Sequence, residues 1–346
     1  MPVKYSFILP VYNCAPYLSA CVAGILALPE LELEILLIDD GSTDGGGAIC
    51  DQLAEQDARI RVLHQQNQGV SAARNRGIQE AAGELLLFFD ADDTVSPEPL
   101  HRLLSQTIPD SPSDLFVFGM SFDTYLHGQL QNREAMLPPF SGPKTIDECR
   151  EALVPLYYAN SLSSLCNKVF RRELLRRYDL RLKSELIQFE DLDFMLRYLS
   201  VCAQVTFVQD CIYHYRQSES VDKAKARLMK IPNLSAVVAH VDASLAPFRS
   251  TAAARGQADE IVKSLYALLA AEKSKYESIS GIRKICGDFA DWKQSAGFSL
   301  DDTDPRILRL LDRNAVLRIW TRNRLRGPVG RLRKLKERLR PGHREG

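Results

Sequence analysis

The stretch LLLFFDADD, residues 85–93, decides the fold, because an apolar run ends there in three aspartates within four positions. A continuous apolar run of this kind is typical of a strand buried on both faces of a parallel sheet. The acidic residues then belong at the end of that strand, where the chain leaves the core. We therefore expect Asp90, Asp92 and Asp93 at the mouth of a buried strand, facing a cation or a cationic partner.

The first hundred residues alternate between apolar runs and helical patterns. The runs YSFILPVY (5–12), LEILLIDD (33–40) and RIRVLHQ (59–65) indicate three earlier strands. Apolar residues recur at helical spacing between them, and SAARNRGIQEAAG (71–83) is expected to be a helix that ends at Gly83. Strands separated by helices require parallel pairing with right-handed crossovers. We therefore expect an α/β fold with a mostly parallel sheet flanked by helices.

The remainder of the chain is less regular. SDLFVFGMSF (113–122) and VTFVQDCIYHYRQ (205–217) have strand character, and FEDLDFMLRYLSVC (189–202) has helical character. QNREAMLPPFSGPK (131–144) is expected to be a connecting loop. From about residue 222 the pattern is helical, which predicts a helical C-terminal extension.

Charge is balanced over the whole chain but unevenly distributed. Lys plus Arg and Asp plus Glu each total 44, yet residues 316–346 carry eleven basic and two acidic side chains, a net charge of +9. Leucines and a valine fall on one helical face of this tail, a pattern typical of a helix on an anionic membrane surface. We expect such peripheral contact through residues 318–340. The same pattern is compatible with nucleic-acid binding or with a helix docked on the acidic body, and an acceptor-binding role is a further alternative. Of these partners, nucleic acid is not expected.

The eight cysteines are scattered without a CxxC pair. Together with the absence of a signal-peptide pattern and of a long apolar span, they favour free thiols in a cytoplasmic protein, peripheral at most to the inner membrane.

Ligands of open α/β sheets bind beyond the carboxyl ends of the strands. Three predicted strands end near Asn13, at Asp39–Asp40 and at Asp90–Asp93, so carboxylates from different strands should meet. Converging carboxylates repel unless a cation intervenes, and oxygen ligands suit Mg²⁺ or Mn²⁺. An Asp-x-Asp at a strand end therefore indicates a metal that bridges to a diphosphate. The alternative is a solvated acidic turn in which Asp92 or Asp93 caps the helix after Pro97.

Four motifs in order carry a family resemblance. FILPVYNCAPYLSACVAGIL (7–26), EILLIDDGSTDGG (34–46), NQGVSAARNRGI (67–78) and GELLLFFDADD (83–93) resemble successive motifs of the family 2 inverting glycosyltransferases of bacterial polysaccharide type, which have a GT-A (Rossmann-like) fold. The resemblance is dense over residues 4–100, with weaker echoes in NKVFRRELL, FEDLDF and YHYRQSES.

The resemblance implies a donor site. It assigns Pro10, Tyr12 and Asp40 to the nucleotide base and ribose, where Asp40 would accept a hydrogen bond from a base N–H, as uracil offers. It places Arg74 near the donor, where a guanidinium could pair with pyrophosphate or with an acidic strand end. The alternatives are a turn closed by Asp40 and a surface role for Arg74.

The same resemblance identifies Asp90 and Asp92 as the DxD motif, which binds Mn²⁺ or Mg²⁺ and the donor ribose. Asp93 lies next to them and could substitute as a ligand. His214 and Arg216 alternate along a predicted strand and so project from one face, in a region that closes over the donor phosphates in the family. A structural histidine is the alternative for His214.

An acceptor hydroxyl needs a general base, and Glu190 and Asp191 supply the candidates. The expected apolar stripe of their helix is Phe189, Leu192, Leu196 and Leu199. Asp191 lies about 110° from the centre of this stripe and Glu190 nearly opposite it, at about 100° per residue. Because a flanking side chain is better placed in a cleft, Asp191 is the expected base, as in the family's Glu-Asp motif. A helix-capping acidic pair is the alternative.

We therefore expect a metal-dependent inverting glycosyltransferase that moves a sugar from a nucleotide-diphosphate donor, a UDP-sugar in first place, to a glycan or lipid-linked glycan acceptor. The expected regions are a donor-binding half (1–110), an acceptor-binding half with the base (111–220) and a helical region with the basic tail (221–346). A non-catalytic nucleotide-sugar-binding or scaffold protein is one alternative. A metal-dependent nucleotidyltransferase is another, although the Gly-rich basic loop typical of that class is missing.

Overall fold

The computed structural model describes residues 4–28, 30–109, 111–126, 128–186, 188–217, 234–274 and 284. One compact unit comprises residues 1–220 and 240–261, and a second comprises residues 221–239 and 262–346. The basic tail expected at residues 318–340 lies outside the described residues.

The strands are β1 (Tyr5–Val11), β2 (Leu33–Asp39), β3 (Ile60–His64), β4 (Leu85–Phe88), β5 (Thr94–Val95), β6 (Leu115–Leu126), β7 (Gln129–Met136), β8 (Gly142–Thr145), β9 (Lys168–Arg171) and β10 (Gln204–Gln217). The α-helices are α1 (Ala15–Leu26), α2 (Gly46–Gln56), α3 (Val70–Glu80), α4 (Pro97–Arg102), α5 (Ile146–Arg150), α6 (Leu153–Tyr158), α7 (Arg172–Arg177), α8 (Glu190–Leu199), α10 (Leu234–Leu245) and α11 (Ala252–Ser274). A π-helical turn, η1 (Leu103–Thr107), continues α4, and a 3₁₀ turn, η2 (Ala246–Phe248), follows α10.

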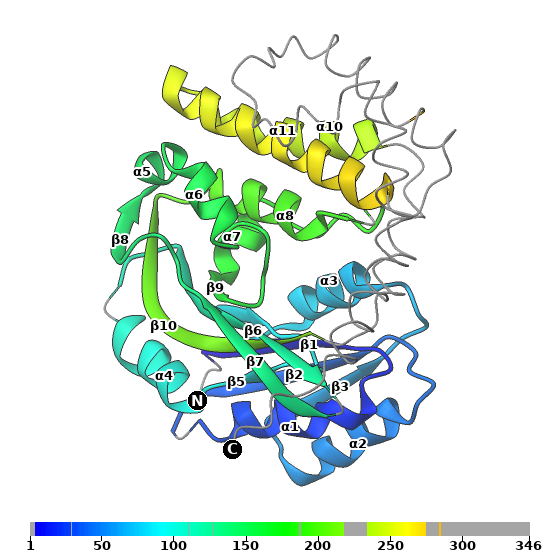
Figure 1. Cartoon of the computed structure of the whole chain (residues 1–346). Helices are drawn as coiled ribbons and strands as arrows, with labels where there is room; N and C mark the ends of the chain where they lie inside the picture. Colours follow the sequence, from blue (N-terminus) through cyan, green and yellow to red (C-terminus); the bar gives the residue numbers. More distant parts are fainter. Residues whose placement is uncertain are drawn as a thin grey trace, which may run out of the picture. The chain divides into compact units, whose positions relative to one another are not determined.

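All strands of the described residues belong to one ten-stranded sheet, in the order β3-β2-β1-β4-β9-β6-β10-β5, with β7 paired to β6 and β8 to β10 (Figure 1). β1 pairs in parallel with β2 and β4, and β2 with β3. β9 lies antiparallel between β4 and β6, and β10 runs parallel to β6. The predicted mostly parallel α/β sheet is confirmed.

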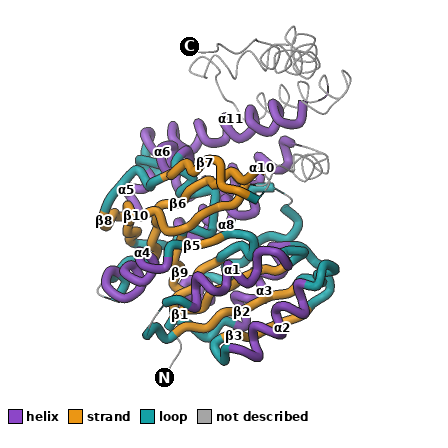
Figure 2. The backbone as a smooth tube through the Cα atoms, turned by 60° about the horizontal axis from the view of Figure 1, so that its bottom comes forward, coloured by secondary structure: helices purple, strands orange, loops and turns teal. Residues whose placement is uncertain are grey.

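The helices between the first four strands cover both faces of the sheet. α1 and α2 lie on one face and α3 on the other (Figures 1 and 2). This arrangement follows from right-handed crossovers, because the chain moves outward from β1 to β3 and then returns past β1 to β4. The return places α3 on the face opposite α1.

An aromatic cluster attaches α8 to the same face of the sheet as α3. The ring of Phe170 in β9 packs edge-on against Phe88 at 5.4 Å and against Tyr198 at 5.0 Å, and Phe194 joins them. All four rings are fully buried. Since Phe88 is paired with Ile8, which faces α3, the cluster brings the start of α8 close to α3.

Two expectations of local structure are wrong. The predicted loop 131–144 contains most of β7 and the start of β8, because the polar sequence of β7 pairs with β6 as an exposed strand. Phe189 is the residue before α8, at φ 63°, and is only partly buried instead of lying in the core stripe. α8 buries residues around most of its circumference, including Phe194, Met195 and Tyr198, so one stripe does not describe it.

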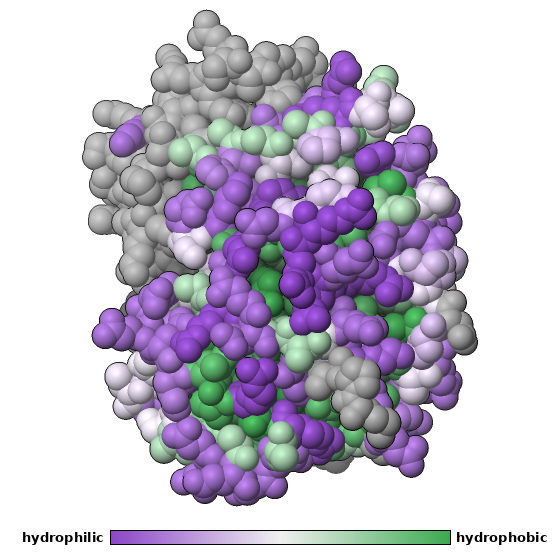
Figure 3. All heavy atoms as spheres, turned by 180° about the vertical axis from the view of Figure 1, so that it is seen from behind, coloured by the Kyte–Doolittle hydropathy of each residue, from purple (hydrophilic) through white to green (hydrophobic). Residues whose placement is uncertain are grey.

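The end of α3 also differs from expectation, since the helix ends at Glu80, with Ala81 in an extended conformation, and not at Gly83. The following expectations agree with the described residues. The described part of the C-terminal region is helical, in α10 and α11. The seven cysteines among the described residues are free thiols. Among the helices described, none has the length and apolar character that crossing a membrane requires. On the face in Figure 3 the described surface is mainly hydrophilic, with hydrophobic residues in small separate patches.

Candidate active site

The carboxyl ends of β1, β2 and β4 meet at one edge of the sheet, as expected. Asp40 N donates to Val11 O at 2.8 Å, and the Asn13 side chain accepts from Thr43 N at 2.8 Å. Asp90 follows β4 at the same edge, since β1 pairs in parallel with both neighbours. Loops from separate strands are therefore tied together where a ligand would bind.

Asp40 is buried and its carboxylate holds the loop before α3. It accepts hydrogen bonds from Gln65 Nε2, Gln68 N and Gly69 N, each at 2.8 Å. Tyr12, by contrast, is 49% exposed, and Pro10 is partly buried. Tyr12 therefore offers an exposed aromatic ring, whereas the hydrogen bonds that Asp40 makes in the structure hold the loop 65–69.

Arg74 joins two carboxylates that belong to different parts of the chain. Its Nη2 lies 2.8 Å from Asp90 Oδ1, and its Nη1 lies 2.9 Å from Asp191 Oδ1. Burial would lower the pKa of Arg74, but Asp191 and Asp90 raise it well above its ordinary value. The guanidinium is therefore a permanent cation between the DxD motif and the Glu-Asp pair.

Gly77 allows α3 to carry Arg74 into this position. A Cβ at Gly77 would lie 2.3 Å from Ile8 Cγ2 in β1, so only glycine permits so close an approach of helix and strand. Arg74 lies one turn earlier on α3, toward the edge of the sheet that carries Asp90.

Glu190 and Asp191 occupy the first turn of α8, and their exposures differ from expectation. Glu190, expected to point outward, is 8% exposed, whereas the side chain of Asp191 is 22% exposed. Burial raises the pKa of Asp191, Arg74 lowers it, and Glu190 and Asp90 raise it, which leaves it at about 6. A carboxylate with a pKa near neutrality and partial access to solvent is suited to accept a proton.

The two remaining aspartates of the strand end differ in their surroundings. Asp92 is exposed, whereas Asp93 is buried and accepts from Tyr213 Oη at 2.5 Å and Arg216 N at 2.6 Å. Burial raises the pKa of Asp93 to about 8, with further contributions from Asp90 and Asp92. Neither residue caps α4, which has Ser96 at its N-cap without a side-chain hydrogen bond.

The donor set fits a divalent cation only if the substrate supplies ligands. In the parts of the chain that the structure describes, no group of three or more His, Cys, Asp or Glu side chains could hold a metal. One oxygen of Asp90 accepts from Arg74, and the other lies 3.4 Å from Cys166 Sγ. Mg²⁺ is commonly held by one or two carboxylates together with substrate phosphates, and the exposed Asp92 with Asp90 matches that pattern.

His214 and Arg216 have separate environments. His214 is 8% exposed, and its ring nitrogens lie 2.7 Å from Ser96 Oγ and 2.8 Å from Ser121 Oγ. Burial lowers its pKa, so it is a neutral, fully bonded ring inside the fold. Arg216 lies at the DxD turn, where its Nε donates to Asp92 O at 3.2 Å.

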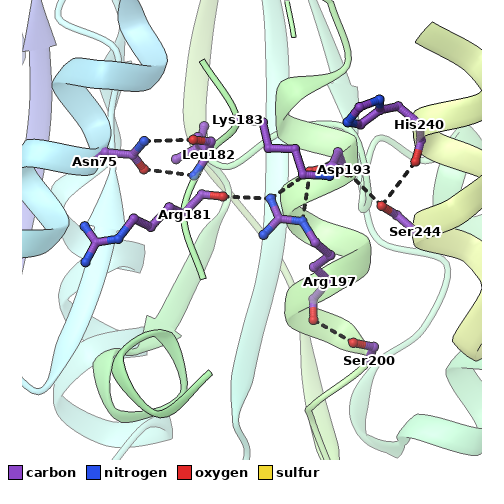
Figure 4. Close-up of polar contacts among 9 residues, drawn as sticks. All are labelled: Asn75, Arg181, Leu182, Lys183, Asp193, Arg197, Ser200, His240 and Ser244. Carbon is purple, nitrogen blue, oxygen red and sulfur yellow. Dashed lines mark hydrogen bonds and ion pairs between the residues drawn. The ribbon is translucent and has the colours of Figure 1, made fainter. Parts of the chain in front are cut away.

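A polar network anchors the helix that carries Asp191 (Figure 4). Asp193 is completely buried, and its carboxylate accepts from Lys183 Nζ at 3.0 Å, from Arg197 Nη2 at 2.7 Å and from Ser244 Oγ at 2.7 Å. The Asn75 amide makes two hydrogen bonds of 2.8 Å with the backbone of Leu182. Asn75 follows Arg74 directly, so neighbouring residues of α3 reach both the base candidate and the loop before α8.

Lys168 is a buried lysine that sequence reasoning did not single out. It is completely buried, donates to Asn167 Oδ1 at 2.6 Å and to Ser164 O, and has a pKa that burial lowers to about 7. Its charge acts on Asp191, whose pKa it lowers. The only sequence signal was a lysine at the start of an apolar strand.

Comparisons with known proteins identify the family. Residues 6–179 match the model of Glycosyl transferase family 2. EpsJ of Bacillus subtilis (strain 168), an uncharacterized glycosyltransferase, is 32% identical over 216 residues, which cover 62% of this chain and 61% of EpsJ. The chain therefore spans about three fifths of the length of this relative. Glycosyltransferase GlyG of Streptococcus pneumoniae serotype 4 is 31% identical over 232 residues, which cover 61% of this chain and 70% of GlyG.

Solved structures agree on the fold. The crystal structure of S. aureus TarS in complex with UDP-GlcNAc has a TM-score of 0.65 at 17% sequence identity and covers 94% of this chain and 92% of that one. At this identity the similarity concerns the fold, and it confirms the predicted GT-A architecture. The family model accounts for half of the chain, and both sequence relatives are glycosyltransferases by description. The chain thus belongs to glycosyl transferase family 2.

Proposed function

We propose that the protein is a metal-dependent inverting glycosyltransferase that moves a sugar from a nucleotide-diphosphate donor to a hydroxyl of a glycan or lipid-linked glycan in cell-surface polysaccharide synthesis. The observation that carries the proposal is the contact of Arg74 with both Asp90 and Asp191. One buried cation thereby links a carboxylate at the donor edge to a carboxylate able to act as a base.

The donor is proposed to lie along the carboxyl edge of the sheet. Tyr12 and Pro10 face the base, and Asp40 holds the loop beside it. A UDP-sugar is the preferred donor, a choice supported by the fold shared with TarS, which binds UDP-GlcNAc. Asp92 and Asp90 would hold Mn²⁺ or Mg²⁺, which when bound neutralises charge on the departing diphosphate. Asp93, engaged inside the fold, is left out of this metal site.

Asp191 is proposed to take the proton of the acceptor hydroxyl as the oxygen attacks the anomeric carbon from the side opposite the diphosphate. The bond to the diphosphate breaks as the new glycosidic bond forms, so the configuration inverts. Arg74 and Lys168 keep Asp191 in its ionised form near neutral pH, since both lower its pKa. Glu190 raises that pKa and, being buried, is proposed to support Asp191 and not to touch the acceptor.

A lipid-linked acceptor and contact with a membrane are proposed from charge alone. Residues 318–340 are basic, and a lipid-linked acceptor would lie at the cytoplasmic face of a membrane, where anionic lipids attract basic segments. The division into a donor half, an acceptor half and a helical region remains a prediction.

The test is a panel of nucleotide sugars with Mn²⁺ or Mg²⁺, in which release of nucleoside diphosphate is measured with and without glycan acceptors. Asp191→Asn should retain donor binding and lower transfer by about 10²–10⁴-fold, the usual effect of losing a general base. Glu190→Gln should have a smaller effect. Donor binding without any turnover of any donor would favour the non-catalytic alternative.

A further inference from the structure

Arg216 is held at the DxD turn from two directions. Its backbone N–H donates to Asp93 Oδ1 at 2.6 Å, and its Nε donates to Asp92 O at 3.2 Å. Tyr213, three residues earlier, fixes the same turn, since its hydroxyl donates to Asp93 and accepts from Asp90 N at 3.0 Å. Hydrogen bonds therefore join the end of β10 to the aspartate turn.

The guanidinium of Arg216 lies over two aromatic rings. Its Cζ lies 3.7 Å from the ring centre of Tyr125 and 4.8 Å from that of Tyr17. Tyr125 comes from the end of β6, next to the turn into β7, and Tyr17 comes from the first turn of α1. Both distances are within the range of favourable cation–π contacts. Elements more than a hundred positions apart thus converge on one side chain.

In the part of the chain that the structure describes, the charge of Arg216 is stabilised by ring contacts and not by a carboxylate. Among the described residues no Asp or Glu carboxylate forms an ion pair with it, and its side chain instead donates to a backbone carbonyl. Arg133, on the same β6–β7 hairpin, shows the contrast, because it pairs with the Asp123 carboxylate at 2.5 Å. A guanidinium stacked on rings keeps its outer N–H donors for an anion, and its planar fork matches phosphate oxygens.

We propose that Tyr17 and Tyr125 are positioning residues that hold Arg216 at the DxD turn, so that its guanidinium binds the diphosphate of the donor. This inference rests on the proposed function and adds to it a role for the β6–β7 hairpin. The rings restrict Arg216 before the donor arrives, so less conformational freedom is lost on binding.

The test compares a nucleoside diphosphate with its nucleoside. UDP, GDP and dTDP are titrated with Mn²⁺ into the full-length protein by calorimetry, and the tightest binder is kept. The affinity of the matching nucleoside is measured by saturation-transfer NMR. Tyr125→Leu and Tyr17→Leu should each lower the affinity for the diphosphate by about 3- to 30-fold, the range of a lost cation–π contact. Both should leave the nucleoside affinity unchanged, because the base is proposed to lie against Tyr12 and Pro10 and not against Arg216.

Conservative and control variants separate positioning from general damage. Tyr125→Phe keeps the ring and should bind as the wild type does, whereas Arg216→Gln should lose the diphosphate preference. Tyr178→Leu is the matched control, since Tyr178 is also exposed and also lies under an arginine, Arg177, at 5.6 Å.

The outcomes distinguish this inference from the proposed function. If the wild type binds none of the three diphosphates, the proposed function fails and the inference with it. If the wild type binds one and the leucine variants bind it equally well, the positioning role is overturned while the proposed function stands. Equal weakening of nucleoside and diphosphate would also overturn it, because the rings would then support the fold as a whole.

Discussion

Replacing Arg74 with methionine removes the cation between Asp90 and Asp191 and keeps an unbranched side chain. Arg74 is 4% exposed, and it donates at 2.8 and 2.9 Å to the two carboxylates. Hydrogen bonds to charged groups are worth about 1.5–3 kcal/mol each. The carboxylates are 27% and 22% exposed, so water can replace part of the hydrogen bonding that Arg74 provides. We therefore expect the free energy of unfolding to fall by about 2–3 kcal/mol in all.

The same substitution should move the pH dependence of transfer. Arg74 lowers the pKa of Asp191, which stands at about 6 with Arg74 present, so removing Arg74 raises it. A neighbouring opposite charge shifts a carboxyl pKa by about 1–3 units. The proposed base must be ionised to accept a proton, so the acidic limb of the rate profile should move upward from pH 6 by that amount. At pH 7 protonation alone then lowers the rate by about 2- to 100-fold.

The assay is nucleoside-diphosphate release from pH 5 to 9, with urea unfolding of the same variants. Arg76→Met is the matched control, because Arg76 is on the same helix but donates to His64 O at 2.7 Å and contacts neither carboxylate. Arg74→Lys should be intermediate, since one ammonium replaces a fork that spans both partners. An acidic limb that stays at pH 6 or moves downward in Arg74→Met would refute the link between Arg74 and the base.

Three further predictions follow from the site, the packing and the tail. EDTA should abolish the release of nucleoside diphosphate, and Mn²⁺ or Mg²⁺ should restore it. Asp92→Asn should weaken donor binding measured by calorimetry. Full activity in the presence of the chelator would exclude the metal role. Gly77→Ala should lower the free energy of unfolding by about 1–3 kcal/mol, the range for overpacking. In the Gly77→Ala, Ile8→Ala double variant the loss should be smaller than the sum of the two single losses, because Ile8→Ala removes the clashing methyl. An undiminished unfolding midpoint in Gly77→Ala would show that the approach of α3 to β1 is not tight. Deleting residues 322–346 should abolish salt-sensitive sedimentation with anionic vesicles and leave transfer to a soluble acceptor intact. If the intact chain ignores such vesicles at low salt, the membrane proposal is lost.

The amino-acid sequence alone determined the first four strands, their parallel pairing and the edge at which their ends meet. These features follow from local properties. An apolar run such as residues 85–89, which follows a predicted helix, is typical of a strand buried in a parallel sheet. Parallel strands place their carboxyl ends at the same edge of the sheet. The DxD and Glu-Asp motifs were equally visible, since each is contained in a few consecutive residues.

The tertiary structure decided which of these groups meet. Arg74 and Asp191 are 117 positions apart, and their contact depends on Gly77 admitting α3 to β1 and on aromatic packing that attaches α8 to the same face. The polar strand β7 exists only because β6 offers it a partner, so no apolar pattern announces it. Periodicity shows which face of an element is apolar, but only packing determines what covers the other faces. The pKa values of charged groups depend on that burial and on the charges nearby.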